Sequence, residues 1–156
     1  MATLKVKLQE DIVLDNQDYG SKRTFEISSI ANITKKIVTI ASDDDATVLV
    51  FKSTVASADG ALDLQTVKYI RITNLGSSNS VNISLQLDSG EDNSAADLSV
   101  THLLEAGRSF LMGAPDEGVH ADDDSATIVT ALTDLESIIV DPGSNSGQVE
   151  VFVAST

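Results

Sequence analysis

Acidic side chains are the residues of this chain best suited to chemistry, and they occur in two consecutive triplets, Asp43-Asp44-Asp45 and Asp122-Asp123-Asp124. Carboxylate oxygens are preferred ligands of Ca²⁺, which takes roughly six to eight oxygens. Neither triplet has the alternating ligand spacing and terminal Glu of an EF-hand, and successive residues of an extended chain point to opposite sides. A solvated turn is the alternative interpretation, and we expect no bound cofactor. The calcium candidates are Asp43, Asp45, Asp122 and Asp124.

Other patterns typical of catalysis are missing from the sequence. It has no cysteine, so thiol catalysis, disulfides and Cys-based zinc sites are excluded. It has no G-x-S-x-G elbow and no phosphate-binding glycine loop, and nothing indicates that His102 and His120 converge. Paired carboxylates remain open as a hydrolytic site, but aromatic residues, which commonly form sugar platforms, make up only 4% of the chain. We therefore expect a protein that is not an enzyme.

Charge is distributed unevenly along the chain. Residues 1–71 contain nine Lys and Arg against ten Asp and Glu, whereas residues 72–156 contain one against 14, and the formal net charge is −14. An anionic surface repels phosphate backbones, so nucleic-acid binding is not expected. No apolar run approaches the length of a membrane span or forms a signal peptide, so we expect no membrane association and synthesis in the cytoplasm.

Short segments of alternating polarity predict strands along most of the chain. The pattern is clearest in residues 67–87, where Ile70 and Ile72, then Val81, Ile83 and Leu85, recur every second position on either side of a loop rich in Asn, Gly and Ser. We predict an antiparallel hairpin here, at the centre of the fold. Turn residues punctuate the chain at short intervals and no long amphipathic helix is expected. The predicted fold is all-β, a single antiparallel β-sandwich of residues 1–156, either jelly-roll-like or immunoglobulin-like.

The remaining elements are predicted in the same way. Residues 36–52 and 100–112 are each expected to form a further hairpin, with a bulge or burial of both faces near Ile37 and Ile40. Residues 56–64 are expected to hold a short helical turn or an excursion from the sheets. Residues 3–8, 25–29, 126–132, 136–140 and 148–153 are expected to be strands.

The segments KYIRITNLGSSNSVNISLQLD (68–88) and LLEAGRSFLMG (103–113) resemble small virion proteins of tailed bacteriophages, in particular capsid decoration or cement proteins. The resemblance lies in a strand ending in Arg-Ile-Thr-Asn, a Ser/Asn turn, an alternating strand and a Gly turn before another apolar strand. It covers about a quarter of the chain. It implies a cofactor-free β-sandwich on the outside of the head that binds the major capsid protein, bridges capsid subunits and associates with itself as a homotrimer.

The charge distribution, combined with this resemblance, predicts which part of the chain docks. The near-neutral N-terminal part is expected to meet an acidic capsid surface, while the acidic loops 88–97 and 116–124 face solvent. Two alternatives remain: a tail, neck or fibre component of a phage particle, or a calcium- or glycan-binding surface module. The predicted capsid-docking residues are Lys5, Lys7, Lys22, Arg23, Lys35 and Lys36.

Overall fold

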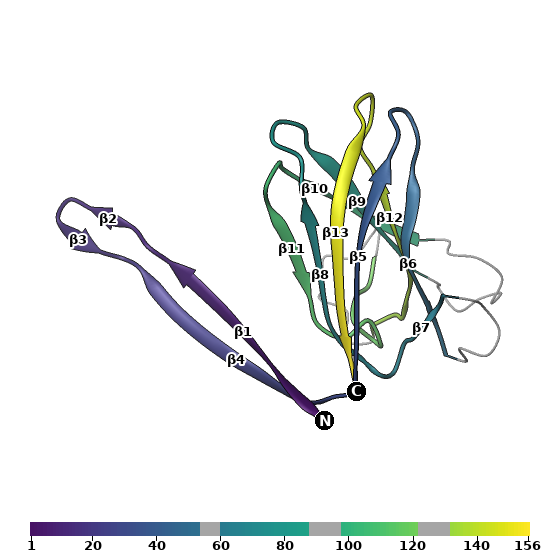
Figure 1. The fold of residues 1–156 in the computed structure, drawn as a ribbon, viewed down its shortest axis with the longest axis horizontal. Helices are drawn as coiled ribbons and strands as arrows, with labels where there is room; N and C mark the ends of the chain where they lie inside the picture. Colours follow the sequence, from purple (N-terminus) through teal and green to yellow (C-terminus); the bar gives the residue numbers. More distant parts are fainter. Residues whose placement is uncertain (54–59, 88–97, 122–131) are drawn as a thin grey trace.

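Two β-sheets pack face to face, and a long two-stranded arm leaves their base (Figure 1). The computed structural model describes residues 1–53, 60–87, 98–121 and 132–156. Within these ranges the regular secondary structure is all strand, as predicted, and no helix is long and apolar enough to cross a membrane. The polypeptide ends, Met1 and Thr156, lie near each other at the base of the sandwich (Figure 1).

The strands are distributed over two large sheets and the arm. The four-stranded sheet has the order β11 (Ser109–Met112), β8 (Val67–Asn74), β13 (Gly147–Ser155), β5 (Asn32–Ile40). The five-stranded sheet has the order β10 (Leu98–Leu104), β9 (Val81–Leu87), β12 (Leu135–Asp141), β6 (Ala46–Lys52), β7 (Leu62–Asp63). The arm pairs β1 (Ala2–Glu10) with β4 (Ser21–Ile30), and its tip pairs β2 (Val13–Leu14) with β3 (Gln17–Asp18).

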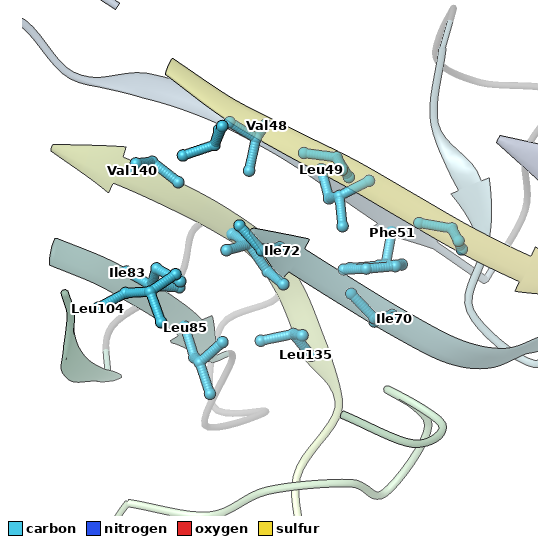
Figure 2. Packing of buried hydrophobic residues seen from close by; sticks show 14 of the residues in the cluster. Val48, Leu49, Phe51, Ile70, Ile72, Ile83, Leu85, Leu104, Leu135 and Val140 are labelled. Carbon is cyan, nitrogen blue, oxygen red and sulfur yellow. The ribbon is translucent and has the colours of Figure 1, made fainter. Parts of the chain in front are cut away.

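The core is the aliphatic layer between the two sheets, and period-two alternation builds it. Ile70 and Ile72 of β8 lie opposite the buried Ile83 and Leu85 of β9 in the other sheet, beside Phe51 of β6 (Figure 2). Burying one such side chain contributes about 1.5–3 kcal/mol, so a layer of Val, Ile and Leu is sufficient without tryptophan. Val149, Val151 and Val153 of β13 are at most 1% exposed and complete the layer, as their spacing predicts.

The order of strands decides between the two predicted sandwich types. Among the strands of the described residues, six consecutive pairs sit in opposite sheets: β5 and β6, β7 and β8, β8 and β9, β10 and β11, β11 and β12, β12 and β13. In an immunoglobulin-type sandwich, by contrast, several consecutive strands pair within one sheet. Leaving aside β7 and the arm, the eight remaining strands have the connectivity of a jelly roll.

The three predicted hairpins are therefore wrong as strand pairs. In each one the chain crosses from one sheet to the other, so the two alternating runs face each other across the core instead of sharing ladder hydrogen bonds. β8 pairs with β11 and β13, whereas β9 pairs with β10 and β12. Alternation identifies the buried face of a strand, and both arrangements bury the same faces.

Two smaller predictions also need correction. β5 pairs with β13 without any register shift, so there is no bulge, and its faces are not both buried because Ile40 is 3% exposed while Ile37 is 57% exposed. The predicted helical turn at 56–64 is wrong where it can be compared, because Leu62–Asp63 forms β7. Residues 54–59 and most of the strand predicted at 126–132 lie outside the described residues.

The side chain of Asn74 stabilises the connection between β8 and β9 through hydrogen bonds. It is 1% exposed, and its side-chain Nδ2 donates hydrogen bonds to the carbonyl oxygens of Asn79 at 2.8 Å and Leu104 at 3.2 Å. Its Oδ1 accepts a hydrogen bond from the Gly76 amide at 2.9 Å. One amide thus satisfies backbone groups of the β8–β9 connection and of the end of β10, which would otherwise be costly to bury.

Candidate binding site: the arm and the groove at its base

The arm is an antiparallel ladder, with a register shift between Ala2 and Leu4 and an unbroken register from there to Glu10, and its two faces differ in chemistry. Opposite residues of an antiparallel pair share a face, and β1 and β4 pair Leu4 with Ile27 and Val6 with Phe25. This apolar face, which we call the inner face, is turned toward the four-stranded sheet, because Leu4, Val6 and Ile27 pack against Tyr69 of β8 and its neighbours. The opposite, outer face carries most of the charged residues of the two strands, namely Lys5, Lys7, Lys22 and Glu26.

The tip of the arm is shaped by a tight turn and a close backbone approach. Asp15 and Asn16 have φ of 51° and 62°, which suits the two-residue type I′ turn that matches strand twist. Below the turn, a Cβ at Gly20 would lie 2.6 Å from the Glu10 carbonyl oxygen, so only glycine lets the two chains pass there. The Gly20 amide also donates a 2.8 Å hydrogen bond to Asp18 Oδ1.

A small second core fastens the base of the arm to the sandwich. Tyr69 is 7% exposed and Ala154 is fully buried, although both lie on the outward side of the four-stranded sheet. Ile30 at the end of β4 covers them together with the inner face of the arm. The rings of Tyr69 and Phe152 meet edge to face, with centroids 6.1 Å apart. The base of the arm is thus packed, while the rest of it extends beyond this contact.

A groove of about 430 Å³ lies between the arm and the four-stranded sheet. One wall is the arm and the other is the outward side of β8, β11, β13 and β5. Several of its apolar side chains stay uncovered: Leu8 is 49% exposed, Phe25 48% and Leu111 49%. The lining residues are Leu4, Lys5, Val6, Lys7, Leu8, Phe25, Lys35, Tyr69, Arg71, Ser109, Leu111 and Phe152.

A cluster of three charges lies on the sheet side of the groove. Glu150 Oε2 accepts a hydrogen bond from Lys35 Nζ at 3.0 Å, and Glu150 Oε1 accepts one from Arg71 Nη2. The Arg71 guanidinium also lies over the ring of Phe152, 5.5 Å from its centroid. The Lys35 hydrogen bond and the two positive charges hold the pKa of Glu150 below its ordinary value. Two cations share one carboxylate, so this wall keeps one net positive charge.

The structure separates the six predicted docking residues into different faces. Lys5, Lys7 and Lys22 share the outer face of the arm, where Lys5 Nζ contacts Glu26 Oε1 at 2.8 Å. Arg23 is opposite Leu8 and so lies on the inner face. On the edge strand β5, alternation places Lys35 on the outward side with the charge cluster, and Lys36 on the opposite side, opposite Val151. They therefore do not form one patch, and only the three lysines of the arm share a face.

Only two of the four calcium candidates lie within the described residues. Asp43 and Asp45 are exposed in the segment that precedes β6. Asp43 lies in a turn with a φ of 59°, and its backbone amide donates a 2.8 Å hydrogen bond to the Gly143 carbonyl oxygen. Asp122 and Asp124, and the loop 88–97, lie outside the described residues. Among the residues that the structure does describe, no group of three or more His, Asp or Glu is arranged to hold a metal ion.

Sequence reasoning missed most of the groove. Tyr69, Arg71, Leu111, Glu150 and Phe152 lie on outward positions of strands that were correctly predicted, and these positions are normally polar and solvated. The available signal was the presence of Phe152 and Leu111 at outward positions, because a large apolar side chain there needs a cover.

Comparison with known proteins adds little to this geometry. No protein-family model matches the chain, and no curated protein matches it. A chain from the solved structure of Bacillus endospore appendages, which "form a novel family of disulfide-linked pili", is similar, with 14% identity over 83% of this chain and 96% of that chain. The TM-score is 0.37. That protein is a structural appendage, and a likeness of this size carries no argument about the role of this chain.

Proposed function

We propose that this chain is a structural subunit of a virus particle: a capsid decoration protein that binds the outside of a tailed-phage head, bridges capsid subunits and catalyses no reaction. The observation that carries the proposal is the arm, because most of it adds little stability to a subunit on its own. An isolated two-stranded hairpin is marginally stable at best, and beyond its base this arm has no packing partner within the described chain. Such a segment gains its stability by lying against a neighbour.

The outer face of the arm is the part best suited to an acidic capsid surface. Lys7 and Lys22 are diagonal neighbours on this face and lie within reach of one partner surface, with Lys5 one step nearer the base. The chain is otherwise strongly acidic, so the lysine-bearing outer face of the arm also orients the subunit as it approaches. Lys35 is a weaker docking candidate than these because Glu150 already binds it.

Sedimentation with empty heads, assembled from the major capsid protein of the same genome, tests the proposal. We expect many copies to co-sediment with each head and to cover its surface in electron micrographs. Binding of a few copies at one vertex would instead indicate a neck, tail or fibre component. Absence of binding, or of any capsid gene in that genome, would contradict the proposal altogether.

Single charge reversals identify the docking face. Lys7→Glu and Lys22→Glu should each weaken head binding roughly two- to fivefold, the range of a solvent-exposed ion pair. Arg108→Glu is the matched control, since it changes the net charge equally at the exposed turn between β10 and β11. Equal loss in all three variants would mean that total charge, and not the arm, controls binding.

A further inference from the structure

We propose that the tip of the arm of one copy occupies the groove of a second copy, in a head-to-tail contact. We define the tip as residues 10–19 and the groove by the lining residues given above. The inference rests on the self-association that the resemblance to capsid decoration proteins implies, and it names the two surfaces that meet. It does not depend on which particle, if any, the assembled copies cover.

The groove has the features of a site that needs an occupant. Its two walls leave Leu8, Phe25 and Leu111 each about half exposed, so an apolar surface persists beside the base of the arm. The sheet wall adds one net positive charge from Lys35, Arg71 and Glu150. Arg23 does not line the groove, but it is opposite the lining residue Leu8 on the inner face of the arm. An occupant should therefore be both apolar and anionic.

The tip is the described segment that best matches these requirements. Residues 10–19 contain four Asp and Glu and no Lys or Arg. The same segment exposes Ile12, Leu14 and Tyr19, at 54%, 58% and 59%. Tyr19 pairs with Ile12 through a 3.0 Å backbone hydrogen bond, and β2 pairs Leu14 with Gln17, so the three apolar side chains share one face. Apolar and electrostatic complementarity thus coincide.

The contact must form between copies. The tip lies at the far end of the arm and the groove at its base, and a regular strand ladder holds them apart (Figure 1). A tip that fills the groove of the next copy leaves its own groove open for a third copy. Such a heterologous contact closes into a ring if the rotation between copies allows it, and otherwise extends into a filament. A homotrimer would be the smallest such ring beyond a dimer.

Matched single substitutions test the contact through the oligomeric state, measured by analytical ultracentrifugation of the whole protein. Leu14→Asp alters the tip and Leu111→Asp alters the sheet wall of the groove. Leu103→Asp is the control, because Leu103 is equally exposed, at 58%, on β10 of the other sheet. Tip and groove variants should each weaken self-association at least tenfold, as expected of a central interface residue, and the control should not. Circular dichroism should show all three folded, since each site is exposed.

Mixing the two defective variants separates a head-to-tail contact from other geometries. Leu14→Asp supplies an intact groove and Leu111→Asp supplies an intact tip, so an equimolar mixture should form dimers and nothing larger. Raising the ionic strength should weaken wild-type association, because exposed complementary charges are screened.

Several outcomes would overturn the inference. They are wild-type protein that stays monomeric at high concentration, tip and groove variants that associate as well as the control, and a mixture that stays monomeric. Head binding by these variants is measured separately by co-sedimentation. If the tip and groove variants show no specific loss of self-association but the protein binds heads, the inference fails and the proposed function stands. If the tip-to-groove contact is confirmed but the protein does not bind heads, the inference stands and the proposed function fails.

Discussion

Asn74→Ala removes the amide that joins three backbone groups at one end of the sandwich, and we expect it to destabilise the fold substantially. The bond to the Leu104 carbonyl is fully buried, and the bonds involving Asn79 and Gly76 are partly buried. A buried group left unpaired costs about 1–3 kcal/mol, and a partly buried one retains some access to water. Counting about 2 kcal/mol for the first and about 0.5 kcal/mol for each of the others gives a loss of about 3 kcal/mol.

Urea denaturation followed by circular dichroism measures this loss. With a slope of about 2 kcal/mol per molar urea, the midpoint should fall by about 1.5 M, while the variant remains folded in buffer. Asn79→Ala is the matched control: it makes the same side-chain change in the same connection, but only the carbonyl of Asn79 takes part in the network and its side chain is exposed. A midpoint shift for Asn74→Ala no larger than that of the control would refute the reasoning.

Three further predictions follow from other parts of the structure. Ile72→Ala should lower the free energy of unfolding by about 2–5 kcal/mol because it leaves a cavity in the core. Ile37→Ala, at an exposed position, should change the free energy of unfolding by less than about 0.5 kcal/mol. Similar losses for the two variants in denaturation experiments would contradict the assignment of Ile72 to the buried face of its strand and of Ile37 to the exposed face. The lowered pKa of Glu150 means that its ionised form stabilises the fold at pH values above the ordinary carboxyl pKa, and this stabilisation is lost as the pH falls through the lowered pKa. Glu150→Gln should therefore make the free energy of unfolding depend less on pH in that range. Identical acid unfolding curves for the variant and the wild type would contradict this contribution of Glu150. Gly20→Ala should speed amide exchange in the arm without shifting the global melting temperature, and unchanged exchange would show that the close approach is tolerated.

Faces of strands could be predicted from the sequence, whereas partners of strands could not. The alternation of Ile70 and Ile72, and of Ile83 and Leu85, identified the centre of the core. The same alternation is satisfied by a hairpin within one sheet and by a crossing between two sheets, because both bury the same side chains. The deciding interactions are long-range, such as the pairing of β5 with β13, and a local pattern carries no information about them.

The arm and the groove show the same limit, because the sequence predicts the strands but not their partners. Leu4, Val6 and Leu8 alternate with lysines as a core strand would, and the strand itself was predicted correctly. Whether such a strand covers the core or leaves it depends on which edges of the sheets are already occupied. The predicted docking lysines of the arm share a face because β1 and β4 pair, but Lys35 and Lys36 diverge because adjacent residues of one strand point to opposite sides.

The position of β13 has a consequence for synthesis on the ribosome. β13 lies between β8 and β5 in the middle of its sheet, so neither neighbour has its full set of ladder partners until β13 has emerged. Nascent chains should therefore leave this sheet incomplete until β13 has been synthesised. A chain that stops before β13 should therefore leave β8 and β5 each without this partner strand.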